Sequence, residues 1–185
     1  MDDEDTALWY RIADLLPEPA SKEVKECWDI GEQECGLGLL VEGLLARQVP
    51  ISGADRAQIS VLAEQWGERE QLTPGLVRCL GDGAPAPVRL LDGDGEGDGG
   101  GDDAVVVTGR SEPELADLVL VPWIGCTRCG QVLLRAHAWE AWDDFSYLAE
   151  HYVISTADHA TALRILPADS VGEAFTELLH NCPAV

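Results

Sequence analysis

A run of twelve residues near the middle of the chain, residues 92–103, contains only Gly, Asp and Glu. Because it has no apolar side chain to bury, nothing offsets the backbone entropy that ordering it would cost, and we expect a solvated tether. Apolar residues recur at helical spacing before this run, whereas strand-like runs begin after it. The sequence therefore predicts an α+β protein of two parts, a helical bundle at residues 1–80 and an α+β domain at residues 104–185, joined by an acidic linker at residues 81–103.

The residues before the linker contain five short stripes of apolar residues at helical spacing. In the first stripe the apolar residues recur at i, i+3, i+4 and i+7, which places them on one face of a helix. Five short amphipathic helices with brief loops predict a small bundle. The expected helices cover about residues 6–16, 21–31, 32–45, 52–67 and 73–80, and Ser21, Ser52 and Thr73 are the expected N-caps.

Three glycines interrupt the third expected helix, namely Gly36, Gly38 and Gly43. Each glycine weakens a helix by roughly 1 kcal/mol relative to alanine, so their presence needs a compensating reason. A residue without a side chain lets a neighbouring helix approach closely, and we expect that role here.

Short strand-like runs follow the linker, at residues 104–107, 118–121, 131–136 and 152–154. A further apolar run at residues 88–91, inside the linker, is too short to classify. Helical patterns are expected at residues 158–166 and 170–180. Short strands joined by turns and followed by terminal helices are typical of an α+β layer.

Acidic residues dominate the charge of the chain, with 34 Asp and Glu against 12 Lys and Arg and a net charge of −22. The excess is spread over the molecule, since residues 1–80 carry 16 acidic and 7 basic residues and residues 104–185 carry 11 and 4. Such a field repels nucleic acid and anionic membranes and speeds encounter with a basic partner. The simpler interpretation is that the acidic residues keep the protein soluble.

The location expected from the sequence is the cytoplasm. The acidic N-terminus, Met1 to Asp5, lacks the basic residues that open a signal peptide, and no apolar run reaches the 18 residues of a membrane-spanning helix. Six cysteines in such a chain are expected to be reduced thiols.

The sharpest chemical motif is the pair Cys126 and Cys129, followed by Gly130, between two strand-like runs. A turn of this kind directs two thiolates at one ion in a zinc knuckle, but a structural zinc site needs four ligands. His180 and Cys182 complete the set most simply, with Cys79 and His137 as further candidates. The alternatives are a redox-active dithiol, which is typically found at the start of a helix, and a reduced, packed hairpin turn.

The acidic run also resembles a calcium-binding loop in part. Residues 92–103 match several positions of a calcium-binding loop, but Gly99 stands at the usual apolar position and Asp103 replaces the usual Glu. The sequence contains no nucleophile elbow, phosphate-binding loop or His-Glu-x-x-His helix. We therefore expect a protein without enzymatic activity and without a cofactor other than the candidate structural zinc.

An aromatic and acidic cluster follows residue 138. Packing of the aromatic residues in the core is the simpler interpretation, and the alternative is an interface in which aromatic residues anchor a partner and carboxylates meet its basic groups. The residues predicted for that interface are Trp139, Glu140, Trp142, Asp143 and Asp144, with Phe145 and Tyr147 beside them.

Residues 7–80 resemble small helical immunity proteins of bacterial polymorphic-toxin systems, the MafI-like group. The resemblance rests on Leu8-Trp-Tyr-Arg-Ile12, on the glycine-containing stretch 37–45, and on Val49-Pro-Ile-Ser52 leading into residues 59–67. It implies a cytoplasmic protein that binds a cognate toxin domain and blocks its active site. Toxin domains of that kind are often basic nucleases, which a strongly acidic partner would suit.

Overall fold

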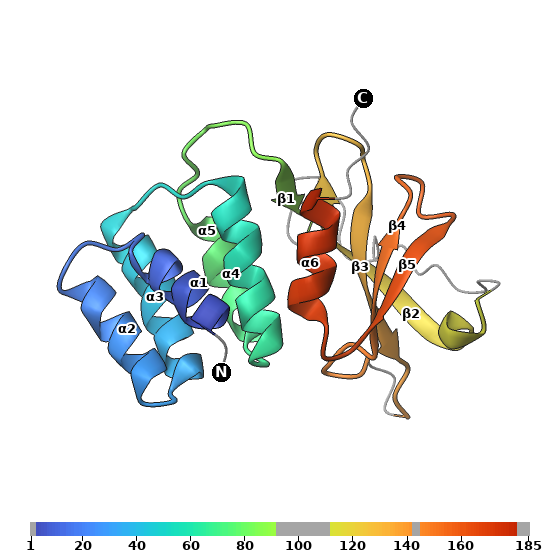
Figure 1. Cartoon of the computed structure of the whole chain (residues 1–185), viewed down its shortest axis with the longest axis horizontal. Coiled ribbons are helices and arrows are strands. Elements are labelled where there is room, and N and C mark those ends of the chain that lie inside the picture. Colours follow the sequence, from blue (N-terminus) through green and yellow to red (C-terminus); the bar gives the residue numbers. More distant parts are fainter. Residues whose placement is uncertain (1–2, 92–111, 142–144, 181–185) are drawn as a thin grey trace. The chain divides into compact units, whose positions relative to one another are not determined.

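The computed structural model describes residues 3–91, 112–141 and 145–180. The chain divides into two compact units, Met1–Ala86 and Pro87–Val185, the first built of helices and the second of a sheet with a terminal helix (Figure 1). The fold class is α+β, as predicted. The predicted calcium-loop match and the predicted tether, residues 92–103, lie outside the described residues, as does the strand-like run at residues 104–107.

Five helices make up the first unit, as the apolar stripes predicted. They are α1 (Asp3–Ala13), α2 (Ala20–Asp29), α3 (Gln33–Arg47), α4 (Gly53–Gln65) and α5 (Arg69–Arg78). Ser52 caps α4 as expected, since its hydroxyl oxygen accepts the amide of Asp55 at 3.0 Å. Gly67, at a φ of +71°, ends α4, and the Glu68 amide closes the turn on the Ala63 carbonyl at 2.7 Å.

Two predicted helix starts are wrong. Ser21 lies inside α2, and its hydroxyl donates to the Asp14 carboxylate at 2.8 Å instead of capping the helix. Helix α5 begins at Arg69 and not at Thr73, because the buried Arg69 side chain pairs with the Glu64 carboxylate at 3.0 Å and ties this turn to the end of α4. A contact with another helix, rather than local capping chemistry, sets this boundary.

Two of the three α3 glycines allow close packing, as predicted. A Cβ on Gly36 would lie 2.6 Å from Cζ2 of Trp9, and one on Gly43 would lie 2.8 Å from Cδ1 of Leu16. Trp9 is fixed in place, since its Nε1–H donates to the Val24 carbonyl at 3.0 Å. Gly38 has open space around its Cα, so close packing does not explain it.

The second unit is built on a five-stranded antiparallel sheet in the order β1-β2-β3-β4-β5 (Figure 1). Its strands are β1 (Val88–Leu90), β2 (Leu118–Cys126), β3 (Val132–Ala138), β4 (His151–Ser155) and β5 (Ala162–Pro167). The unclassified run at residues 88–91, placed in the linker on sequence grounds, contains β1. Its pairing with β2 makes it part of the second unit.

The predicted helix at residues 158–166 is wrong, because β5 occupies most of it. A turn precedes the strand, in which the Asp158 carboxylate accepts the Thr156 hydroxyl at 2.6 Å and the Ala160 amide at 3.1 Å. These two hydrogen bonds lower the pKa of the Asp158 carboxyl. The final helix, α6 (Val171–His180), agrees with the prediction.

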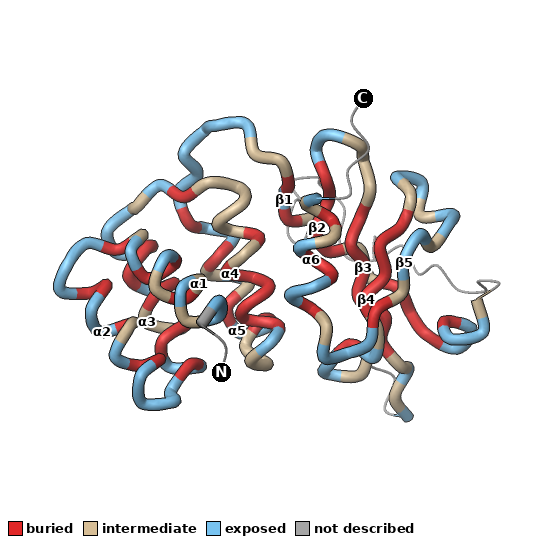
Figure 2. Tube along the Cα trace, viewed as in Figure 1, coloured by how far each residue is buried: buried red, intermediate tan, exposed pale blue. Residues whose placement is uncertain are grey.

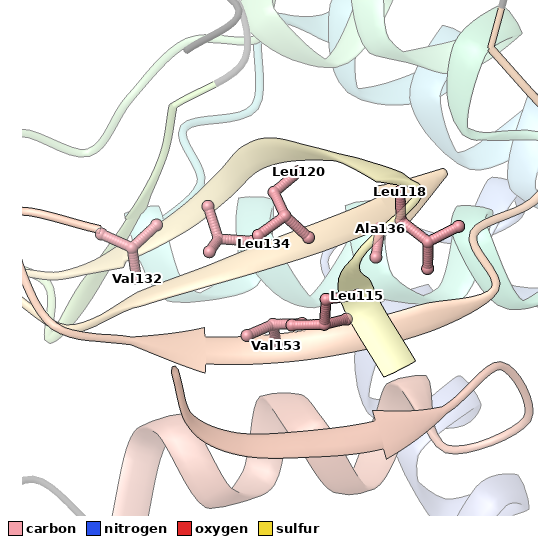
Figure 3. Close-up of a cluster of buried hydrophobic side chains, with 7 residues drawn as sticks. All are labelled: Leu115, Leu118, Leu120, Val132, Leu134, Ala136 and Val153. Atoms are coloured by element: carbon pink, nitrogen blue, oxygen red, sulfur yellow. The ribbon is translucent and has the colours of Figure 1, made fainter. Parts of the chain in front are cut away.

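Both faces of the sheet are apolar, and the central strands are buried along most of their length (Figure 2). Figure 3 shows one face, where side chains of β2, β3 and β4 gather with Leu115 of the short 3-10 helix η1 (Pro113–Leu115). Helix α6 packs on the opposite face and is tied to β5 by the ion pair of Arg164 with Glu177 at 2.9 Å. No helix in the described part of the chain is both long and apolar enough to cross a membrane.

The glycine contacts predict opposite effects of two substitutions in one helix. Gly36→Ala should lower the free energy of unfolding by about 1–3 kcal/mol, since the added methyl group meets the fixed Trp9 ring. Gly38→Ala, with nothing within 4 Å, should raise it by about 0.5–1 kcal/mol through helix propensity. Denaturant titrations of both variants measure the difference, and equal effects would contradict the close-packing role.

Candidate functional site

Among its described residues, the segment that joins β3 to β4 exposes three large apolar side chains. Trp139 is 54% exposed, Tyr147 58% and Leu148 56%. The core-packing interpretation of the aromatic cluster is therefore wrong for Trp139 and Tyr147, while Phe145 is partly buried. We call the three exposed side chains the β3–β4 apolar patch.

Trp139 is held against Phe145 across the loop. The two residues form an isolated antiparallel bridge, and their rings meet edge to face with centroids 5.1 Å apart. Such aromatic pairs contribute about 0.5–1.5 kcal/mol beyond the area they bury. The Trp139 ring is therefore positioned by a neighbour and not free to rotate, although more than half of it faces solvent.

Ser146 fixes the loop through its backbone and its side chain. Its amide donates to the Ala138 carbonyl at 2.8 Å, and its hydroxyl donates to the Leu148 carbonyl at 2.9 Å while accepting the Ala138 amide at 3.1 Å. Nδ1 of the buried His137 donates to the Ser146 carbonyl at 2.8 Å, since a carbonyl oxygen can only accept. These hydrogen bonds tie Ser146 and its neighbours to the end of β3 and orient the side chains beside them.

The protrusion of the patch follows from an interruption in the β3–β4 ladder. The Glu150 amide donates to the Ala136 carbonyl at 2.8 Å, but Ser146 already pairs with Ala138, two residues further along β3. Residues 147–149 are therefore extra on one side, as in a bulge. Ala149 points inward and is 3% exposed, whereas Tyr147 and Leu148 point outward.

The structure describes only two of the five residues predicted for the interface. Trp139 and Glu140 follow β3 directly, with Trp139 exposed and Glu140 partly exposed, whereas Trp142, Asp143 and Asp144 lie outside the described residues. Sequence reasoning left Leu148 and the exposed Glu150 out of the site. No local pattern marks them, since their outward position depends on how the extra residues fit into the ladder.

The second predicted site, the Cys126–Cys129 pair, lies in the turn between β2 and β3. The turn closes through the Cys126 amide, which donates to the Gln131 carbonyl at 2.8 Å, and through Gly130, which has a φ of +76°. This geometry is that of a hairpin turn between two strands, which the zinc-knuckle and the packed-turn interpretations share. Cys126 is 4% exposed and Cys129 is partly exposed, so only one thiol is readily accessible.

One contact brings this turn to the end of α6. The Arg128 guanidinium donates to the Leu179 carbonyl at 2.7 Å, beside His180. Nδ1 of His180 donates to the Thr176 carbonyl at 2.9 Å, which leaves only Nε2 to bind a metal ion. Cys182 lies outside the described residues, and among the residues the structure does place, no three His, Cys, Asp or Glu side chains group as metal ligands.

His137 does not belong to a zinc site with this turn. It lies at the far end of β3 from Cys129, and at about 3.3 Å per residue the strand separates them by more than a zinc ligand can span. The set Cys126, Cys129, His180 and Cys182 stays a prediction.

Comparison with known proteins identifies no relative of the chain. No protein-family model, no curated protein and no solved structure matches the chain. The features that bear on function are therefore the charge of the chain and the side chains that the fold leaves exposed.

The exposure of Leu148 predicts that its side chain contributes little to the free energy of folding. Leu148→Ser should change the free energy of unfolding by less than about 0.5 kcal/mol, as for other surface substitutions. Leu134→Ala, at a position that is 0% exposed in the sheet core, should lower it by about 2–5 kcal/mol. Thermal and denaturant unfolding of the two variants measures both changes, and a large loss for Leu148→Ser would mean that the loop is a packing element.

Proposed function

We propose that this chain is a non-enzymatic immunity protein that neutralises a cognate, basic toxin domain by binding it through the β3–β4 apolar patch. The observation that carries the proposal is the patch itself, three large apolar side chains held outward by a hydrogen-bonded loop. Trp and Tyr are the residue types that most often anchor protein interfaces. In this proposal the protein acts in the cytoplasm.

The charge around the patch supports a basic partner. Residues 112–180 contain three arginines, and each is engaged within the unit. Arg128 donates to the Leu179 carbonyl, Arg164 pairs with Glu177, and Arg135 is 4% exposed and lies over the Trp123 ring at 5.7 Å. With the exposed Arg89 of β1 included, acidic side chains still outnumber basic ones in the described part of the sheet unit, which speeds association with a positively charged protein.

A second copy of the chain is a less suitable occupant of the patch. Two molecules would each bring a net charge of −22 to the contact, and like charges across an interface oppose association. Nucleic acid and anionic membranes are disfavoured for the same reason. The resemblance of residues 7–80 to MafI-like immunity proteins supports a toxin domain as the basic partner.

Co-expression tests this function directly. A toxin domain encoded beside the gene for this chain should arrest growth when expressed alone and should be neutralised by the full chain, with which it should co-purify. Association should slow as salt is raised, because salt screens the attraction. Absence of both neutralisation and a complex, or self-association of the chain through the patch, would contradict the proposal.

Three variants of the full chain locate the contact. Trp139→Ala and Leu148→Ser should each weaken toxin binding by about 5- to 30-fold, equivalent to about 1–2 kcal/mol per anchor residue. Leu163→Ser is the matched control, since Leu163 is also an exposed leucine, at 43%, but lies on β5 near the Ser155 end of β4. Titration calorimetry measures all three, and equal losses in Leu163→Ser and Leu148→Ser would place the contact elsewhere.

A zinc-stabilised adaptor protein is the second candidate, favoured by the contact of Arg128 with the end of α6. It predicts one zinc per chain, held by the Cys126–Cys129 turn with His180 and Cys182, and lost in Cys129→Ser. The immunity proposal needs no metal, and under it Cys129→Ser should bind the toxin like the unsubstituted chain. Metal analysis of the purified protein, together with unfolding before and after chelation, separates the two.

A further inference from the structure

Two cysteines from different helices of the first unit lie on either side of the turn at Gly31. Cys27 is in the last turn of α2 and Cys35 is in the first turn of α3. The Glu32 amide donates to the Cys27 carbonyl at 2.8 Å, and the Gly36 amide donates to the Glu32 carbonyl at 3.0 Å. A Cβ on Gly36, the neighbour of Cys35, would lie only 3.0 Å from Cβ of Cys27. The turn at Gly31 thus folds the backbone beside Cys35 onto the Cys27 side chain.

The two thiols lie close enough for Cys35 to affect the pKa of Cys27, and they differ in access to solvent. Cys27 is 8% exposed, whereas Cys35 is exposed. Burial raises the pKa of the Cys27 thiol, and Cys35, Glu32 and Glu26 raise it further. An oxidant in solution therefore meets Cys35 first, while Cys27 stays protonated and shielded.

We propose that Cys27 and Cys35 are a reversible oxidation site, at which a peroxide converts the two thiols into an intramolecular disulfide between α2 and α3. The inference is independent of toxin binding, because it rests on the contact between two helices of the first unit. A solvent-accessible cysteine beside a second, resolving cysteine is the arrangement that favours disulfide formation over irreversible oxidation.

The reaction balances with hydrogen peroxide as the oxidant. The Cys35 thiolate attacks one peroxide oxygen, the O–O bond breaks, and the departing hydroxide takes a proton to leave as water, which leaves Cys35 as a sulfenic acid. Cys27 then loses its proton as its sulfur attacks the Cys35 sulfur and displaces hydroxide, which leaves as a second water. Two thiols and one hydrogen peroxide become one disulfide and two waters.

The surroundings provide a spectroscopic readout. The Trp9 ring lies against Gly36, with its Cζ2 atom 2.6 Å from a Cβ built there, and Trp9 and Trp28 have ring centroids 5.1 Å apart. A disulfide quenches the fluorescence of a nearby indole. The bond would also close the loop across the Gly31 turn and restrict the unfolded chain, which should shift the folding equilibrium about 10- to 100-fold towards the folded state.

Peptide mapping of the full chain tests the site. The reduced, desalted protein is treated with about one equivalent of hydrogen peroxide and analysed by mass spectrometry. We expect a peptide linked through Cys27 and Cys35, lower tryptophan fluorescence and a higher denaturant midpoint, all reversed by dithiothreitol. Cys35→Ser should abolish all three changes, and this variant should fold because the side chain is exposed.

Cys129→Ser is the matched control, since Cys129 is the other described cysteine with solvent access, and it should leave the Cys27–Cys35 link intact. Cys27→Ser alters a buried position, so its result is used only if its far-ultraviolet spectrum matches that of the unsubstituted chain. The proposal is overturned if Cys35 proceeds to a sulfinic acid while Cys27 stays a thiol. It is also overturned if Cys35→Ser leaves the fluorescence change in place.

Discussion

The pairing of β2 with β3 is the interaction on which the second unit depends. The register runs from Leu118 opposite Ala138 to Gly125 opposite Val132, and β3 pairs with β4 on its other side. Alternation along β3 then directs Leu134 and Ala136 into one apolar cluster and Leu133 and Arg135 towards the face covered by α6. The same strand carries the two candidate sites at its two ends, the cysteine turn before Val132 and the apolar patch after Ala138.

The effect of the acidic excess on the surface depends on which basic side chains are engaged inside the fold. In the helical unit several basic side chains are occupied internally, as when Arg56 donates to the Cys79 carbonyl at 2.8 Å and Arg11 pairs with Asp55 at 2.8 Å. In the sheet unit Arg128, Arg135 and Arg164 are also engaged, whereas Arg89 of β1 is exposed. Several basic side chains take part in contacts within the fold, while most carboxylates stay exposed. The exposed surface is therefore more acidic than the composition alone indicates. An apolar patch in such a surface favours a partner that is both basic and apolar.

Local chemistry predicted the elements whose causes are local. The Ser52 cap, the glycine that ends α4, the amphipathic stripe of α6 and the turn at Cys126 and Cys129 each depend on residues close in the chain, and each agrees with the structure. Where a distant partner decides, the pattern failed. Strand β1 forms because β2 pairs with it, and β5 forms in place of an expected helix because it pairs with β4.

The sequence by itself determined an acidic chain of two parts, helical before the glycine-rich run and mixed after it, because apolar spacing and turn residues act within a few positions. Only the tertiary structure decided which aromatic residues are exposed and which cysteines lie near each other. Tyr147 and Leu148 face solvent because extra residues bulge out of the β3–β4 ladder, and Cys27 lies beside the start of α3 because Gly36 lets α3 approach α2 and Trp9. Spacing along the chain cannot encode either outcome, since both depend on register and close packing between separate elements.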